Sequence, residues 1–221
     1  MIRCTVLNNA RDAEIGAQES VVKTALVIGR AQGTWEQVDA ANRLVGSVTG
    51  PFDTVIAVND SGHDYPHVDH WVSFHGDKFE KWLRIRQQHG FEPVSTIWTS
   101  TYGRKESAYE RKLVSMGVRR LHYTGGGSSG LVATLIALVP LQATHIVLAG
   151  IPMDVEAGHY NEDGPWKEAV KHRKAWRDIA ADLMPNVRSM AGWTAQELGF
   201  PDPAWLMEQH AVKKNVKGVR S

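Results

Sequence analysis

The sequence predicts an open α/β fold, in which a mostly parallel sheet carries helices on both faces. Short apolar runs rich in β-branched residues alternate along the chain with segments of helical character, which is the pattern of repeated βαβ units. Most of these runs are continuously apolar, as expected for strands that are covered on both faces. Several of them end in glycine or polar residues. Since ligands bind such sheets outside the carboxyl ends of the strands, these ends predict a common binding rim.

The composition limits the classes of protein to consider. The chain has 221 residues, of which 43% are hydrophobic, so it is long and apolar enough for one large domain with a buried core. The formal net charge of +1 gives no global argument for nucleic acid or membrane. The single cysteine, Cys4, excludes an internal disulfide and suits a reducing, cytoplasmic location. No apolar run reaches the roughly 18 residues of a membrane span.

The first half of the chain is expected to alternate strands with helices. Arg3–Leu7 reads as an edge strand or a loose arm. Thr24–Gly29 reads as a buried strand, followed by a turn with Gly33 and a helix over 35–45 for which Thr34 is a suitable cap. The turn is not GxGxxG, so the dinucleotide fingerprint is absent. Further strands are predicted at 53–58, 68–74 and 93–98, with a helix at 78–89.

The second half continues the same alternation. A short helix is predicted at 108–116 and a strand at 118–123, followed by a glycine-rich turn, a buried helix and an apolar strand that ends near Gly150. A long helix follows, with Pro165 in its first turn. The final elements are a strand at 186–190 and two short helices at 194–198 and 203–209. The chain is thus divided into an N-terminal strand or arm (1–23), a main Rossmann-like domain (24–200), and a C-terminal helix with a basic tail (201–221).

The glycine-rich turn GGGSS is the most informative local feature. Gly125, Gly126 and Gly127 can all adopt positive φ, and such a turn can direct backbone N–H groups at an anion. Ser128 and Ser129 follow at the start of the buried helix, where the helix dipole favours negative charge. No lysine follows the glycines, so this is not a Walker A loop. The alternative interpretation is that a serine simply caps the helix.

Histidines and aspartates are concentrated after the second predicted strand. The set comprises His63, His67, His70, His75, Asp60, Asp64, Asp69 and Asp77. Their spacing fits no known zinc module or HExxH helix, so no metal site is predicted. His63 and His67 are interpreted as solvated loop residues. Only His75, at a strand end, is expected on the binding rim.

Two later histidines are candidates for a general base. His159 lies in the polar stretch after Asp154, and His172 lies on the long helix beside Lys171, Arg173, Lys174 and Arg177. Imidazole titrates near neutral pH, so either ring suits proton transfer. The basic helix can neutralise a diphosphate or can simply be a solvated face. There is no GxSxG nucleophile elbow, and Cys4 lies far from the rim, so covalent catalysis is unsupported.

Several segments occur in an order typical of a known group of proteins. They are ALVIGRAQGTW, DTVIAVND, DHWVSFHGD, GGGSSGLVATLIALVPLQATHIVLAGIPMD and VRSMAGW. This order resembles the DUF115-like group, which includes the 6-hydroxymethylpterin diphosphokinase MptE-like proteins, and the related CstII-type sialyltransferases of family GT42. The resemblance covers roughly residues 24–195. It implies a Rossmann-like transferase that binds a nucleotide.

The resemblance also implies roles for individual residues. The first phosphate-side loop corresponds to Gly29, Arg30 and Gly33, and the other positions that the resemblance places at the nucleotide are Asn59, His75, Ser128 and Ser129. The strand ends and the glycine turn themselves add Asp60, Gly126, Gly127 and Asp154 as candidate binding residues. The sialyltransferases place a catalytic histidine after the G-[IV]-D strand, a role for which His172 and His159 both stay open. Two departures stand out: the first loop lacks a proline and contains Arg30, and the carboxylate of the G-[IV]-D motif is displaced to Asp154.

Three functions are compatible with these features. The leading one is a nucleotide-sugar-dependent glycosyltransferase-like enzyme, in which the donor is a co-substrate, a histidine deprotonates a hydroxyl of a small-molecule or glycan acceptor, and no metal is required. The first alternative is an Mg²⁺-dependent diphosphokinase of a pterin-like alcohol, with Asp60 or Asp154 holding the ion. The second is a non-catalytic nucleotide-binding module, or a viral transferase whose acceptor is a DNA base. The oligomeric state stays open.

Overall fold

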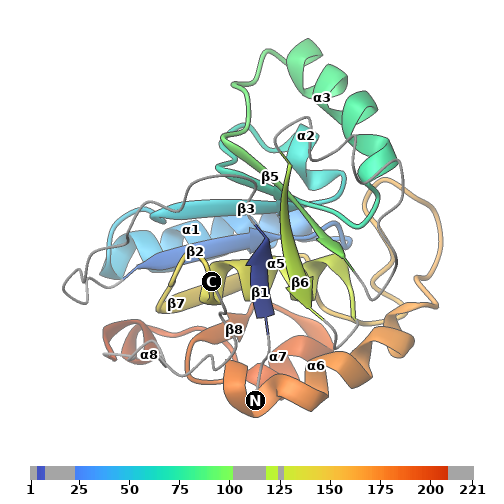
Figure 1. Cartoon of the computed structure of the whole chain (residues 1–221). Helices are drawn as coiled ribbons and strands as arrows, with labels where there is room; N and C mark the ends of the chain where they lie inside the picture. The colour runs from blue at the N-terminus through green and yellow to red at the C-terminus, as the bar shows by residue number, and fades with distance from the viewer. Residues whose placement is uncertain (1–3, 8–22, 102–117, 124–126, 209–221) are drawn as a thin grey trace.

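The computed structural model describes residues 4–7, 23–101, 118–123 and 127–208, and they form a Rossmann-like α/β fold (Figure 1). The sheet has the strand order β1-β6-β5-β4-β3-β2-β7-β8. The seven strands from β6 to β8 in this order pair in parallel with their neighbours. Strand β1, at the edge of the sheet, pairs with β6 antiparallel. The strands are β1 (Cys4–Leu7), β2 (Thr24–Ile28), β3 (Thr54–Val58), β4 (His70–Val72), β5 (Thr96–Thr101), β6 (Arg119–Tyr123), β7 (His145–Ala149) and β8 (Val187–Ser189).

The central strand β2 shows why the apolar runs are continuous. It pairs with β3 on one side and with β7 on the other, and all five of its side chains are buried. Because alternate residues of a strand face opposite sides of the sheet, Ala25 and Val27 belong to one core cluster, while Leu26 and Ile28 belong to the other. A strand that is buried on both faces has no polar positions to alternate with.

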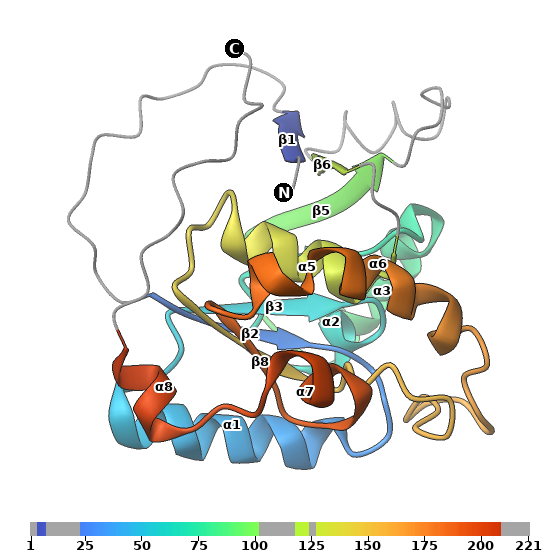
Figure 2. The ribbon, with the colours of Figure 1, turned by 90° about the horizontal axis from the view of Figure 1, so that it is seen from below.

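Helices cover both faces of the sheet, as predicted (Figure 2). On one face lie α1 (Thr34–Val48), α3 (Phe79–Gln88) and α8 (Pro203–Met207). On the other face lie α5 (Ser129–Leu138) and α6 (Ala169–Leu183), while α7 (Gly192–Leu198) packs against β8 and α6. Two short elements, α2 (Ser61–Asp64) and the 3-10 turn η1 (Gly76–Lys78), follow β3 and β4.

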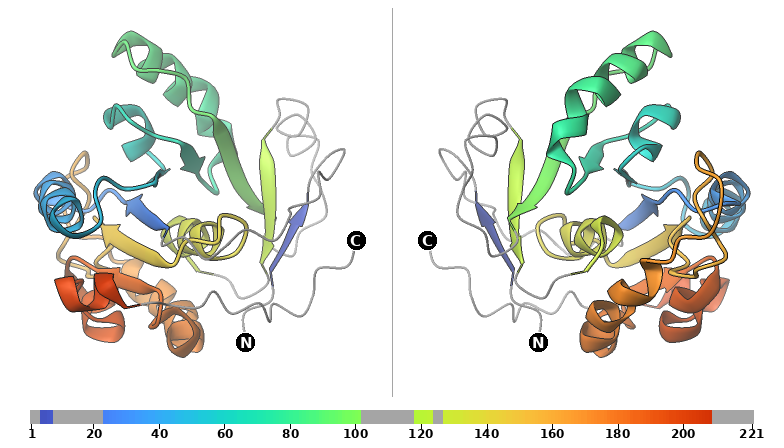
Figure 3. Two further views of the ribbon diagram at one scale, coloured as in Figure 1. Left: turned by 90° about the vertical axis from the view of Figure 1, so that its left-hand side faces the viewer. Right: turned by 90° about the vertical axis from the view of Figure 1, so that its right-hand side faces the viewer.

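Helix α5 occupies a special place in this arrangement. It rests on the concave face of the sheet and contacts β2, β3, β4, β6 and β7 (Figure 3). Its first nine residues are all buried, which explains why its sequence is apolar on every side. Its N-terminus lies at the carboxyl ends of the central strands, since Ser128–Gly130 border the same space as Gly29, Asn59 and Gly150.

The strand order contains a topological switch point between β2 and β7. From β2 the chain builds outward through β3, β4 and β5, and later returns to the other side of β2 to form β7 and β8. The connections that leave β2 and β7 consequently run to opposite faces of the sheet. In open α/β folds the crevice left between such connections is the usual ligand site.

Two helix starts differ from the predictions. Gly33, not Thr34, is the N-cap of α1, with φ of 75°, and Thr34 is the first helical residue, whose hydroxyl donates to the Ala31 carbonyl at 2.5 Å. The late helix begins at Ala169 rather than near Pro165, and the residues before it form a tighter turn in which the amide of Ala169 donates to the carbonyl of Trp166 at 3.1 Å.

Other predicted features lie outside the described residues, namely the helix at 108–116, Gly125 and Gly126, and the basic C-terminal tail. Within the described part of the chain, no helix has the length and apolarity needed to cross a membrane.

Candidate functional site

A cavity of ≈ 370 Å³ lies at the switch point. It is bounded by the segments that follow β2, β3, β4 and β7 and by the residues that begin α5, so the predicted strand ends do meet at one rim. Its volume falls within the usual range for small-molecule sites. Most of the predicted site residues line it: Gly29, Arg30, Asn59, His75, Gly127, Ser128, Ser129, Asp154, His159 and His172. Gly33 and Asp60 do not line the cavity, and Gly126 falls outside the described residues.

Close packing of two strand ends explains Gly29. Its amide donates to the carbonyl of Ala149 at 2.7 Å, and the amide of Ala31 donates to the carbonyl of Gly150 at 3.1 Å. A Cβ atom on Gly29 would lie 2.1 Å from the Gly150 carbonyl oxygen, so no side chain fits there. Gly150, just after β7, has φ of 70°, and a Cβ atom there would lie 2.1 Å from the hydroxyl oxygen of Thr34. This pair of glycines brings β2 and β7 together where the cavity opens.

The N-terminus of α5 presents its dipole to the cavity. Ser128 is the N-cap in extended conformation, and its hydroxyl oxygen accepts from the amide of Leu131 at 3.3 Å. The capping role is therefore real, yet Ser128, Ser129 and Gly130 all line the cavity as well. First-turn amides have no acceptor within their own helix, and the partial positive charge at this end favours an anion. Gly127, with φ of 112°, supplies the turn that precedes them.

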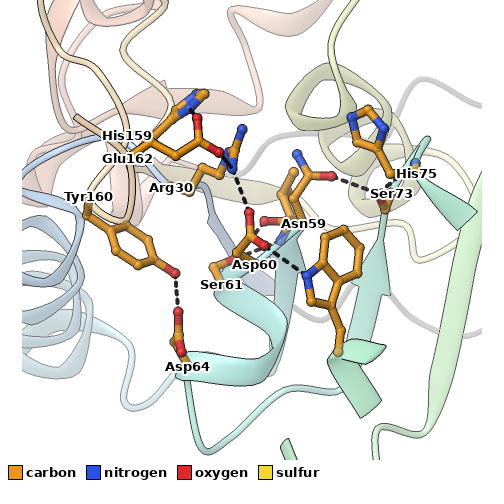
Figure 4. A network of polar contacts seen from close by, with 12 residues as sticks. Arg30, Asn59, Asp60, Ser61, Asp64, Ser73, His75, His159, Tyr160 and Glu162 are labelled. Atoms are coloured by element: carbon orange, nitrogen blue, oxygen red, sulfur yellow. Dashed lines mark hydrogen bonds and ion pairs between the residues drawn. The ribbon is translucent and has the colours of Figure 1, made fainter. Parts of the chain in front are cut away.

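Asn59, just after β3, presents the NH₂ group of its side-chain amide to the cavity. It adopts a left-handed conformation with φ of 57°, which asparagine tolerates well. Its Oδ1 accepts from the hydroxyl of Ser73 at 2.7 Å (Figure 4). Its backbone carbonyl accepts from the indole of Trp71 at 2.6 Å. No described residue accepts from its Nδ2, which leaves two N–H donors beside the cavity.

The guanidinium of Arg30 is held by two carboxylates. One nitrogen donates to Asp60 at 2.6 Å and to Glu162 at 2.9 Å (Figure 4). Asp60 is buried behind Arg30, where it also accepts from the indole of Trp82 at 2.8 Å. Burial alone would raise the pKa of Asp60, but the interaction with the nearby His63 ring and the hydrogen bonds from Arg30 and Trp82 hold that pKa well below its usual range. The predicted direct contact between Asp60 and a ligand is thus blocked by Arg30.

His63 is buried, not solvated as predicted, while His67 is exposed. The ring of His63 lies between two carboxylates, with Nδ1 2.8 Å from Asp64 and Nε2 3.8 Å from Asp60. Burial alone would lower the pKa of His63, but its interactions with Asp60 and Asp64 outweigh burial and raise that pKa to about 9. His63 is thus charged at neutral pH and offsets the negative charges of Asp60 and Asp64 at the two ends of α2.

This histidine predicts a pH dependence of stability. An unfolded histidine has a pKa near 6.5, below the folded pKa of about 9, so its contribution is fully present below about pH 6.5 and is lost as the pH rises through about 9. We expect a loss of up to about 3 kcal/mol across this window. Urea unfolding of the wild type and His63→Gln between pH 6 and 10 measures it. If the two pH profiles run parallel, the charged form of His63 contributes nothing.

The connection between β7 and α6 forms one wall of the cavity. The Tyr160 hydroxyl donates to Asp64 at 2.5 Å, and its ring lies 5.2 Å from that of Trp35. Burial and the hydrogen bond to Asp64 raise the pKa of Tyr160 far above its usual value, so this phenol stays protonated. Trp166, which the sequence analysis missed, lies between two histidines, 5.1 Å from the His159 ring and 5.7 Å from the His172 ring. The connection is therefore pinned to α1 and α2 and carries His159, and its Trp166 packs against His172 of α6 on the same side of the cavity.

The three cavity histidines share one electrostatic property. Burial lowers the pKa of His75, and Lys78 adds to the effect. Burial also lowers the pKa of His159 and of His172, although Glu162 opposes it in the first and Glu168 in the second. Burial thus lowers the pKa of all three imidazoles and favours their neutral forms, which can accept a proton.

The basic helix α6 carries ion pairs rather than free charges. Lys171 pairs with Glu168 at 2.7 Å, Lys174 with Asp178 at 2.7 Å, and Arg177 with Glu197 at 3.1 Å. Arg173 pairs with Asp154 at 2.9 Å, and the other oxygen of Asp154 accepts from the amide of Trp193 at 3.1 Å. The side chains of Lys171, Lys174 and Arg177 are exposed, as expected for a solvated helix face, whereas Arg173 is only 25% exposed. Asp154 lies at the cavity but is bound to α6 and α7.

No arrangement of three or more histidines, cysteines or acids suited to a metal ion occurs among the described residues. Comparison with known proteins adds no assignment, since no family model, curated protein or solved structure matches the chain. The function has to be argued from the cavity itself.

Proposed function

We propose that the protein is a transferase that binds a nucleotide-activated sugar in the switch-point cavity and transfers the sugar to a hydroxyl acceptor. One observation carries the proposal: the N-terminus of α5 and the free amide of Asn59 meet neutral histidines around a single cavity. The helix end and the amide suit the phosphates of the donor. A neutral imidazole suits deprotonation of the acceptor. The order of segments shared with the DUF115-like group and the GT42 sialyltransferases supports the same reading.

The proposed step uses these groups in separate roles. A histidine, His159 or His172, takes the proton of the acceptor hydroxyl while its oxygen forms a bond to the anomeric carbon. The bond between that carbon and the phosphate oxygen breaks, and the electron pair leaves with the nucleotide. The negative charge that develops on the phosphate lies at the N-terminus of α5, where oriented amides stabilise it without reorganisation.

The alternatives receive less support from the geometry. A diphosphokinase would need Asp60 or Asp154 for Mg²⁺, and both carboxylates already bind arginine, Asp60 through Arg30 and Asp154 through Arg173. An enzyme acting on DNA would need cations free for phosphates, but four cations of α6 are engaged in ion pairs. The described part of the chain thus favours a donor that is held by amides rather than by a metal.

Calorimetric titration distinguishes these functions. We expect CMP-, UDP- or GDP-linked sugars to bind with an affinity that does not change when EDTA replaces Mg²⁺, because backbone and amide donors hold the phosphates. ATP titrated under the same two conditions tests the diphosphokinase alternative, which predicts that ATP binds only when Mg²⁺ is present. If every nucleotide sugar fails to bind, or if binding disappears with EDTA, the glycosyltransferase proposal is wrong.

A further inference from the structure

The two candidate bases differ in what holds their rings. Nδ1 of His159 lies 3.1 Å from Oε2 of Glu162. The other oxygen of Glu162 accepts from Arg30 at 2.9 Å, and Arg30 donates onward to Asp60 at 2.6 Å. Figure 4 shows this series of contacts running from His159 through Glu162 and Arg30 to Asp60, at the ends of β2 and β3. The His172 ring has a backbone hydrogen bond to Gly127 instead, and Glu168 acts on it through its charge.

The contact with Glu162 determines the tautomer of His159. The hydrogen bond from His159 lowers the pKa of Glu162, and Arg30 adds to the effect, so this carboxylate is ionised at neutral pH. An ionised carboxylate has no proton to donate, so Nδ1 of the neutral ring must carry the hydrogen. Nε2 then holds the free lone pair on a ring that lines the cavity. The carboxylate also brings a negative charge beside the ring, which favours the imidazolium more than an uncharged backbone carbonyl does.

We propose that His159 is the general base of the transfer and that Glu162 is a positioning residue that fixes its Nδ1–H tautomer. This assignment rests on the proposed function. Nε2 takes the acceptor proton, and the resulting imidazolium is stabilised by the adjacent Glu162 carboxylate, which itself stays unprotonated. Arg30 is then assigned to support of the base: it ties Glu162 to Asp60 and so fixes a residue of the β7–α6 connection to the rigid ends of β2 and β3.

The surroundings of His159 contain few other charges. Glu162, Arg30 and Asp60 are the charged groups that act on its ring, and the ring of Trp166 packs 5.1 Å away. Glu162 opposes the effect of burial on the His159 pKa, whereas Arg30 reinforces it. Removing the charge of Glu162 should therefore lower the pKa of His159 and release its tautomer.

Long-range ¹H–¹⁵N correlation spectra of the histidine rings test the assignment in the full chain without any ligand. In the wild type we expect His159 as the Nδ1–H tautomer at pH 8. In Glu162→Gln its titration midpoint should shift downward and the Nε2–H form should appear, while the His172 signals stay in place. The matched control is Glu168→Gln, which should lower the midpoint of His172 and leave His159 unchanged. A wild-type His159 protonated on Nε2, or an unchanged His159 in Glu162→Gln, overturns the assignment.

Turnover measurements separate this assignment from the proposed function. With a nucleotide sugar that binds, His159→Gln should lower kcat by about 10²- to 10⁴-fold with little change in KM, the usual contribution of a general base, and His172→Gln should lower it less. The reverse order of the two losses contradicts the role of His159. If no nucleotide sugar binds while Glu162 still controls the tautomer of His159, the proposed function is wrong and only the positioning by Glu162 stands.

Discussion

Replacing Arg86 with methionine is expected to destabilise the protein by about 3–5 kcal/mol, because the substitution removes the hydrogen-bond donors of four carbonyl oxygens around a buried guanidinium. Arg86 is only 2% exposed. Its guanidinium donates to the carbonyls of Gly62, Tyr65, Pro66 and Glu92 at 2.6–2.8 Å. Methionine retains much of the aliphatic stem but leaves these oxygens without a partner, and each buried unsatisfied carbonyl costs about 1–3 kcal/mol before any water enters.

The consequence extends from α3 to the cavity. Three of the four carbonyls that Arg86 binds belong to α2 and to the segment after it, and α2 carries His63 and Asp64. Asp64 in turn accepts from Tyr160, in the connection between β7 and α6 that forms one wall of the cavity. We therefore expect the loss of Arg86 to loosen the β7–α6 connection in addition to lowering global stability.

The natural control for Arg86→Met lies on the same helix. Arg84 is exposed, so Arg84→Met should change the free energy of unfolding by no more than about 0.5 kcal/mol. Arg86→Lys keeps the charge but replaces five fixed donors with a point charge. Its free energy of unfolding should lie between those of Arg86→Met and the wild type. Urea unfolding followed by tryptophan fluorescence provides the measurement. A cost of Arg86→Met below about 1 kcal/mol would mean that water replaces the guanidinium without penalty.

Arg86 also shows what local sequence patterns cannot reveal. Its helix has buried positions at Phe79, Trp82 and Arg86, which follow the spacing of an amphipathic face. An arginine at the end of that face reads as exposed, because charged residues are almost never fully buried without partners. Its partners are backbone carbonyls up to 24 residues away, and backbone groups leave no trace in side-chain patterns.

The strand ends, in contrast, were predictable. Each of Gly29, Asn59 and His75 directly follows an apolar run, and the rule that parallel strands end at one edge is sufficient to bring them together. What could not be predicted is which of these polar residues face the cavity. Arg30 and Asp60 both follow strands, yet their mutual ion pair joins residues 30 positions apart and turns Asp60 away from the cavity.

The carboxylate that positions His159 was missed for a related reason. Glu162 lies in the stretch HYNEDG, which has the composition of an ordinary surface loop. Its importance comes from Arg30, 132 positions earlier, and only the folded chain brings the two together. The partners of two arginines of α6 are hidden from the sequence for the same reason. Asp154 lies 19 positions from Arg173, and Glu197 lies 20 positions from Arg177.

Asn59→Asp is expected to weaken nucleotide binding by about 100- to 1,000-fold. Aspartate tolerates the left-handed backbone at this position and can still accept from the Ser73 hydroxyl, so the fold should be retained. The substitution replaces the two free N–H donors with a carboxylate. It therefore removes a hydrogen bond to a charged phosphate, worth about 1.5–3 kcal/mol, and adds repulsion between like charges.

The most direct test of the central claim, that the switch-point cavity holds the phosphates of the donor, is a pair of calorimetric titrations. Asn59→Asp and Asn42→Asp make the same change in net charge, but Asn42 is exposed on α1 and does not line the cavity. With the nucleotide sugar that binds the wild type most tightly, we predict at least a 100-fold loss of affinity for Asn59→Asp, about 2.7 kcal/mol, and an unchanged affinity for Asn42→Asp. Equal affinities for the wild type and Asn59→Asp would contradict a phosphate site in this cavity.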